Sequence, residues 1–217
     1  ATVALCPAAA DGDDVVIYSD YTRSAEIERF NFLRQQKPKG NGQANFCLSD
    51  FVAPVDSGVA DHMGFFAVTA GEGIEKKVEE FEAAHDDYSA ILLKALADRL
   101  AEALAERMHE RVRRDLWGYA SGETLDSQGL IKEQYLGIRP APGYPACPDH
   151  SEKRKLFDLL DAETNSKMSL TSGYAMLPAA SVSGYYFAHP QSQYFVLGNV
   201  LEDQLADYAR RKGIEIE

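Results

Sequence analysis

The most restrictive feature of the sequence is the segment Gly137–His150, GIRPAPGYPACPDH, which holds four of the chain's nine prolines. Proline fixes its own φ and restricts the residue before it, so this segment cannot be helical and is a poor central strand. We expect an extended, stiff loop with a turn at Gly143. Such a loop holds its side chains and carbonyls in place before a ligand arrives, which lowers the ordering cost of binding.

Three residues of this loop have side chains or backbone suited to a small ligand. The planar guanidinium of Arg139 suits a carboxylate, and the ring and hydroxyl of Tyr144 suit a flat, partly polar group. Gly143 would let a ligand approach the backbone. Together they predict a site for a small zwitterion with a flat ring. A rigid connector, with Arg139 in a surface salt bridge, explains the same residues and stays open.

Composition and charge exclude several classes of function. A length of 217 residues suits one large domain or two small ones, and no apolar run is long enough to span a bilayer. The net charge of −12 argues against nucleic acid, whose phosphates demand a basic surface, and against docking on anionic lipid. We therefore expect neither nucleic acid nor a membrane as a partner.

The three cysteines are odd in number and widely spaced, at Cys6, Cys47 and Cys147. Free thiols are typical of a reducing compartment, so we expect a cytoplasmic protein. The histidines and cysteines show no metal-ligand spacing, and we predict no metal site. Cys147 could be reactive because it lies in the rigid loop, but we favour a buried, inert thiol.

The hydrophobic pattern predicts an α+β fold: a largely antiparallel sheet with one long helix and several shorter helices, in one unit over residues 1–217. In the long helix, expected over Asp86–Trp117, an apolar residue recurs every four positions and should form the packed stripe, whereas the face with Glu102 and His109 should be solvated. The stripe consists of Leu92, Leu96, Leu100, Leu104, Met108, Val112 and Leu116. Small alanines beside Glu102 would let another segment come close. Strands are expected at Thr2–Cys6, Val15–Tyr18, Met63–Thr69, Tyr174–Leu177, Ser181–Ala188 and Tyr194–Leu197. Further helices are expected to begin at Ile74 and to span Leu130–Tyr135 and Glu202–Lys212. Another should begin at a capping box formed by Asp149–Glu152 and end at Asp161.

The segment Arg139–His150, RPAPGYPACPDH, resembles the signature of the activation domain of cobalamin-dependent methionine synthase. The similarity runs nearly end to end: further matching segments are AHDDY (84–88), KALADRLAEA (94–103), HERVR (109–113), ASVSGYYF (180–187) and DYARRKG (207–213).

The resemblance implies a function within methionine biosynthesis. The full enzyme is a methyltransferase that moves a methyl group from methyltetrahydrofolate to homocysteine through cobalamin. Its activation domain binds S-adenosylmethionine and supports reductive methylation of cob(II)alamin to methylcobalamin, with an electron from flavodoxin or a reductase. The isolated chain is not expected to be active alone.

The resemblance also implies which residues contact S-adenosylmethionine. None of them needs to act as an acid or a base, because the sulfonium already activates the methyl group and the domain's task is positioning. The implied contacts are Glu102, Arg139, Ala141, Gly143, Tyr144, Tyr194 and Phe195.

Two departures from the family pattern leave alternatives open. The family domain begins earlier and has an upstream acidic contact, so we expect a chain truncated at its N-terminal side. The sequence also lacks a D-x-H-x-x-G cobalamin motif and a cysteine zinc site, so the cobalamin-binding domain should lie elsewhere on the same parent polypeptide. The alternatives are a docking module for the cobalamin domain and electron donor that binds no ligand itself, and a stand-alone corrinoid-reactivating protein.

Overall fold

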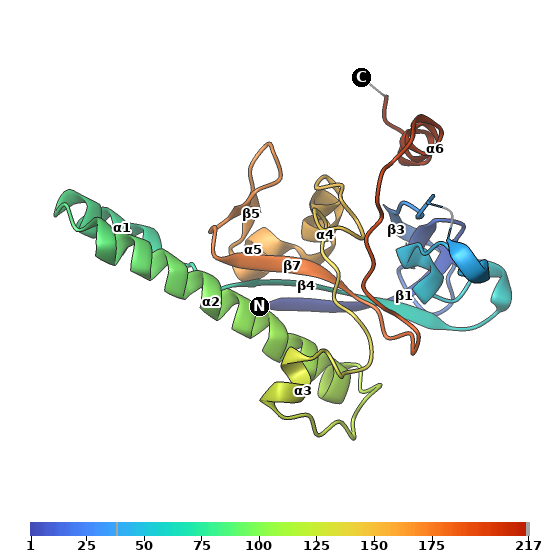
Figure 1. Ribbon diagram of the computed structural model, residues 1–217, viewed down its shortest axis with the longest axis horizontal. Coiled ribbons are helices and arrows are strands. Elements are labelled where there is room, and N and C mark those ends of the chain that lie inside the picture. The colour runs from blue at the N-terminus through green and yellow to red at the C-terminus, as the bar shows by residue number, and fades with distance from the viewer. Residues whose placement is uncertain (38, 216–217) are drawn as a thin grey trace.

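The computed structural model describes residues 1–37 and 39–215 of the chain, and its centre is an antiparallel sheet (Figure 1). Within the described residues this sheet has five strands in the order β3-β2-β1-β4-β7. A separate two-stranded sheet pairs β5 with β6. The strands are β1 (Thr2–Asp11), β2 (Asp14–Tyr18), β3 (Glu26–Asn31), β4 (Asp61–Thr69), β5 (Ser169–Leu170), β6 (Met176–Leu177) and β7 (Ser181–Tyr186).

The helices lie on both faces of the sheet: α2 follows one face, and α4 and α5 cover the other (Figure 1). The α-helices are α1 (Ile74–Ala83), α2 (Asp87–Arg111), α3 (Ser127–Ile131), α4 (Glu152–Leu160), α5 (Ala162–Ser166) and α6 (Glu202–Lys212). Short 3-10 turns span Gly40–Gly42, Leu48–Phe51 and Val55–Ser57, and a π-helical turn over Val112–Leu116 extends α2. The predicted α+β class is therefore confirmed, with the long helix and the closing helix where the sequence placed them.

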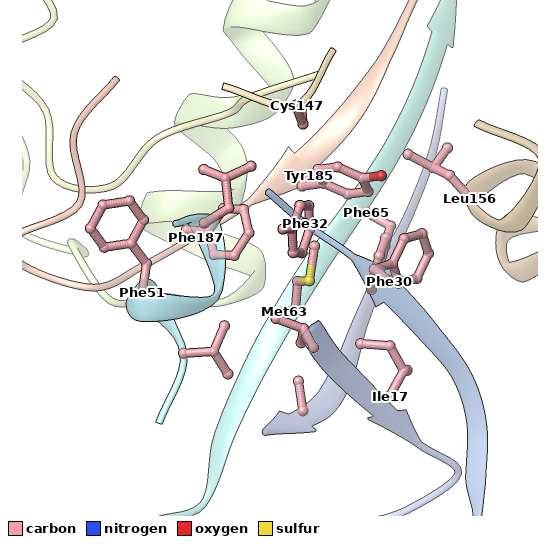
Figure 2. Close-up of a cluster of buried hydrophobic side chains, with 14 of the residues drawn as sticks. Ile17, Phe30, Phe32, Phe51, Met63, Phe65, Cys147, Leu156, Tyr185 and Phe187 are labelled. Atoms are coloured by element: carbon pink, nitrogen blue, oxygen red, sulfur yellow. The ribbon is translucent and has the colours of Figure 1, made fainter. Parts of the chain in front are cut away.

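Side chains along β4 and β7 alternate between the two faces of the sheet, so hydrophobic clusters form on both faces. Phe65 and Tyr185 pack with Phe30 on the side of α4, in the larger cluster that Figure 2 shows. Their neighbours Phe66 and Tyr186 point to the other face, where their stacked ring centroids are 4.7 Å apart beneath α2. Successive side chains of a strand point to opposite faces, so β4 and β7 carry both cores.

The packing face of α2 differs from the prediction. The first three leucines of the predicted stripe are exposed, with relative exposures of 44% at Leu92, 52% at Leu96 and 61% at Leu100. The later members Leu104, Met108 and Val112 do pack in the core cluster beneath α2, as predicted. In the first part of the helix the buried residues are alanines, including Ala101 and Ala105, and the buried face continues to His109 at 0% exposure. Alanine side chains let the helix backbone lie close to the sheet, and this turns the row containing Glu102 towards the proline-rich loop.

Two further local predictions were wrong. Residues 194–197 form no strand, because their neighbour is the proline-rich loop; Leu197 makes one backbone bond to it, donating to the Pro145 carbonyl at 2.9 Å. The capping box is also absent: the Ser151 hydroxyl donates to Asp149 Oδ1 at 2.7 Å, and the Glu152 carboxylate accepts the Asn31 N–H at 3.1 Å. Ser151 thus makes a local contact, and Glu152 makes a tertiary contact with β3.

No helix in the described ranges is long and apolar enough to cross a bilayer.

Candidate functional site

The proline-rich loop lies against the outer edge of β7 and contains neither helix nor strand, as predicted. The Tyr185 N–H donates to the Pro140 carbonyl at 2.9 Å, and Ile138 forms an antiparallel bridge with Phe187. Gly184 makes this approach possible, because a Cβ there would lie 2.6 Å from the Pro140 oxygen. The loop then turns at Gly143, whose N–H donates to the Cys147 carbonyl at 2.8 Å.

A cavity of about 680 Å³ opens between this loop, α2, β7 and the segment 194–196. Ala101 and Ala105 of α2 form part of one wall, so the small side chains do admit a neighbouring segment. Six of the seven residues implied by the resemblance line the cavity, namely Glu102, Arg139, Ala141, Tyr144, Tyr194 and Phe195. The structure therefore brings together residues from three separate parts of the chain.

Gly143, the seventh implied contact residue, forms the expected turn but does not line the cavity. Its φ is +96°, and an added Cβ would lie 2.2 Å from Cε1 of the His150 ring. The imidazole thus occupies the space that the missing side chain leaves, where the sequence suggested a ligand. Gly143 shapes the site by letting His150 pack against the turn.

Arg139 is held in place from three directions. Its Nη2 lies 2.7 Å from Glu106 Oε2, and its Nη1 donates to the Tyr135 hydroxyl at 3.4 Å. Its backbone N–H donates to the Tyr194 hydroxyl at 3.0 Å, which leaves the hydroxyl proton of Tyr194 free for another acceptor. Burial alone would lower the pKa of Arg139, but the nearby charge of Glu106 outweighs it and the pKa is raised.

Glu102 lies at the exposed rim of the cavity. Its side chain is 58% exposed and pairs with Arg99 at 2.9 Å between Oε2 and Nη1. Asp98, one turn earlier on α2, lines the same cavity. This rim carries two carboxylates and the Arg99 guanidinium and is open to solvent, whereas the side chain of Arg139 is only 24% exposed.

Sequence reasoning missed three polar residues of this site: Glu106, His150 and Lys153. Glu106 could have been found because it follows Glu102 by four residues and so shares its helix face. Lys153 Nζ lies 2.7 Å from His150 Nδ1 and donates to the Tyr174 carbonyl at 3.2 Å. An ammonium can only donate, so His150 Nδ1 is the acceptor of this hydrogen bond. Burial lowers the pKa of Lys153.

Cys147 is buried, and its thiol donates to the Ala141 carbonyl at 2.9 Å between Sγ and O. Burial raises the pKa of this thiol, and nearby Glu152 and Asp149 raise it further. The interpretation of Cys147 as a buried thiol is confirmed. All three cysteines are free. Residues 1–37 and 39–215 contain no cluster of three or more His, Cys, Asp or Glu that could hold a metal.

His109 is fully buried near Arg139 and makes the stability of the fold sensitive to acid. Its ring stacks on Tyr186 at 5.2 Å and meets Tyr135 edge-on at 4.9 Å. Burial, with smaller contributions from Arg113 and Arg139, lowers its pKa from 6.5 to about 2. Below pH 6.5 the His109 imidazole therefore binds a proton in the unfolded chain but remains neutral in the folded chain.

We expect the stability of the wild-type chain to be full above about pH 7 and to fall as the pH drops below about 6. The contribution of His109 is about 1.4 kcal/mol per pH unit, hence about 2 kcal/mol at pH 5. Urea unfolding at pH 7 and pH 5 measures it, with His109→Gln as the comparison. Equal losses in both proteins would show that another group causes the acid sensitivity.

Comparison with known proteins agrees with the resemblance noted in the sequence. The family model described as the vitamin B12-dependent methionine synthase activation domain matches residues 1–213. The chain belongs to this family. A crystal structure of the MetH reactivation domain bound to AdoHcy matches this activation domain with a TM-score of 0.96 and 55% sequence identity. The match covers 98% of this chain and 65% of that one, so the activation domain described here spans about two thirds of the length of its relative.

Proposed function

We propose that this activation domain binds S-adenosylmethionine in the cavity beside the proline-rich loop. The observation that carries the proposal is the convergence of six implied contact residues on one cavity of about 680 Å³. That volume lies within the range of small-molecule sites. A relative of 55% identity and the same fold has been solved bound to AdoHcy, which supports a ligand of this class.

The charges along the cavity suit the amino-acid end of this ligand. Glu102 at the rim offers a negative charge to an ammonium, and Arg139 offers N–H donors to a carboxylate beside the free hydroxyl proton of Tyr194. Tyr144, which is 65% exposed, supplies an aromatic face at the mouth. Ala141 and Phe195 complete the walls.

In this proposal the chain works by positioning. The sulfonium of the ligand already activates its methyl group, so no side chain of this domain has to move a proton. The residues of the cavity fix the direction of that methyl group and limit the access of water. Cobalamin would be bound by another domain of the parent polypeptide, where it supplies the methyl acceptor for reactivation of a 5-methyltetrahydrofolate–homocysteine methyltransferase.

We also propose a cellular location and partners for the domain. The free thiols favour a cytoplasmic location. The partners we propose are the cobalamin-binding domain of the same polypeptide and an electron donor, either flavodoxin or a reductase. We also propose that residues 1–217 act as a single domain.

Thermal unfolding tests whether the folded chain binds this class of ligand. At a concentration 100 times its dissociation constant, S-adenosylhomocysteine should stabilise the chain by about 2.7 kcal/mol, a rise in Tm of roughly 5–10 °C. Adenosine and methionine, each carrying half of the ligand, should give smaller shifts. No shift with any of the three would favour a docking module that binds no ligand of its own.

Tyr194→Phe should weaken S-adenosylhomocysteine binding by about 0.5–1.5 kcal/mol, because the Arg139 N–H loses its acceptor and the ligand loses a donor. The fold should be unaffected, since Tyr194 is at the cavity and is 41% exposed. Equilibrium dialysis measures the affinity. An unchanged value would remove the hydroxyl from the proposed contacts.

A further inference from the structure

Arg113, in the π-helical turn that extends α2, is a fully buried arginine that does not line the cavity. Its Nε and Nη2 donate to the two carboxylate oxygens of Glu123 at 2.7 and 2.6 Å, and the Glu123 side chain is only 8% exposed. Taking two charges out of water is costly, and such a pair often adds little stability compared with apolar residues of the same size. The burial of this pair therefore points to a role other than stability.

The Arg113 guanidinium also lies over the ring of Tyr135. Its Cζ is 4.3 Å from the ring centroid, which is the geometry of a cation–π contact, and its Nη1 has no hydrogen-bond partner among residues 1–37 and 39–215. The ring of His109 meets the same tyrosine edge-on, with centroids 4.9 Å apart. Arg113 and His109 are both fully buried, so together they fix the orientation of the Tyr135 ring.

The buried pair also fixes the path of the chain between α2 and Tyr135. Residues 118–126 contain no helix or strand, and α3 follows them beside the C-terminal end of α2 (Figure 1). Within this loop the Ala120 N–H donates to the Arg113 carbonyl at 2.8 Å, and the Glu123 N–H donates to the Ala120 carbonyl at 3.0 Å. The side-chain pair thus joins the loop to the end of α2.

The hydroxyl of Tyr135 connects the buried pair to the cavity. It accepts from Nη1 of Arg139 at 3.4 Å, while Nη2 of Arg139 lies 2.7 Å from Glu106 Oε2. A guanidinium has five N–H groups in one rigid plane, so two fixed partners set the direction of the other three. Arg139 lines the cavity, whereas the buried pair and Tyr135 do not. The buried pair can therefore affect a ligand only through Arg139.

We infer that Arg113 and Glu123 are positioning residues for Arg139, and that they act on it through Tyr135. The inference rests on the proposed function and deepens it, because it assigns a part in ligand recognition to residues that touch no ligand. The buried pair fixes the ring, and the hydroxyl of the ring holds one N–H of Arg139. The guanidinium is then already oriented when the ligand carboxylate arrives, which lowers the ordering cost of binding.

The first test is calorimetric titration of Tyr135→Phe with S-adenosylhomocysteine. This substitution keeps the ring and removes the hydroxyl, so affinity should fall about fivefold, the scale of one hydrogen bond. In an Arg139→Lys background the planar fork is already gone, and the same substitution should change affinity by less than about twofold. Tyr88→Phe is the matched control and should bind like the wild type, because Tyr88 is 76% exposed and does not line the cavity.

The second test concerns the buried pair itself. Arg113→Lys keeps a charge opposite Glu123 but loses the flat group over Tyr135, so affinity should fall about threefold. This loss should disappear in the Tyr135→Phe background, where the connecting hydroxyl is absent. Glu123→Gln should give the same pattern and serves as the test if Arg113→Lys does not fold. Arg107→Lys is the control, because Arg107 is 61% exposed and pairs with Glu110. Circular dichroism establishes that each variant is folded.

Two results would overturn the inference while leaving the proposed function intact. One is wild-type affinity in Tyr135→Phe, or in the folded variant of the buried pair. The other is an equal loss in the single and the combined variants, because a purely structural effect would simply add to the second substitution. Failure of the wild type to bind S-adenosylhomocysteine would overturn the proposed function itself.

Discussion

Replacing Arg139 by alanine should weaken the binding of S-adenosylhomocysteine by about 30- to 1,000-fold, or about 2–4 kcal/mol. The substitution removes the cation that faces the ligand carboxylate. It also leaves the carboxylate of Glu106, now 2.7 Å from the guanidinium, without its partner at the cavity wall. The remaining negative charge would repel the carboxylate of the ligand, so the loss exceeds that of a single contact.

Isothermal titration calorimetry at low and high salt measures this effect. Arg114→Ala is the matched control, because Arg114 is an exposed arginine that pairs with Glu110 and lies outside the cavity. Glu106→Gln separates the two causes: it keeps the guanidinium and should weaken binding less than Arg139→Ala does. If Arg139→Ala binds like the control, the guanidinium has no role in recognition.

Gly143→Ala should both destabilise the fold and impair the cavity. At φ +96° a non-glycine residue is strained, which costs roughly 1–3 kcal/mol. The added methyl group would also lie 2.2 Å from the His150 ring and force it out of its place. Because His150 Nδ1 lies 2.7 Å from Lys153 Nζ and both residues line the cavity, the disturbance should lower ligand affinity as well.

Urea unfolding and ligand titration together measure the two effects of Gly143→Ala. Gly122→Ala is the control, since no atom lies within 4 Å of the position of its added Cβ and its φ is ordinary. In the double variant Gly143→Ala/His150→Ala the clash is relieved and the backbone strain remains, so part of the lost stability should return. Wild-type stability in Gly143→Ala would contradict the tight packing of the turn.

The sequence predicted the elements whose signals are local. Gly213 ends α6 with φ +71°, and the side chain of Asp86 accepts the Ser89 N–H at the start of α2. The prolines likewise excluded regular structure from the loop. Each of these signals lies within a few residues of the feature that it determines.

The failures arose where tertiary packing decided the outcome. The leucines in the first half of α2 have the spacing of a buried stripe, but the alanines there allow the closer approach and are buried instead. The segment around Tyr194 is rich in residues that favour strands, yet it lies beside prolines, which have no N–H group to donate to a β-ladder. For the site, the family resemblance supplied residues that now lie around one cavity. The spacing of Glu106 from Glu102 could have revealed its place on the same helix face, whereas the roles of Lys153 and His150 depend on contacts between elements that no spacing along the chain reveals.

The central claim is that the cavity beside the proline-rich loop binds S-adenosylmethionine, and calorimetric titration of the folded chain tests it most directly. We expect saturable binding of one ligand per chain, lost or strongly weakened in Arg139→Ala and in Tyr144→Ala. Absence of binding to a chain shown by circular dichroism to be folded would contradict the claim. Binding of equal strength in both variants would place the ligand elsewhere.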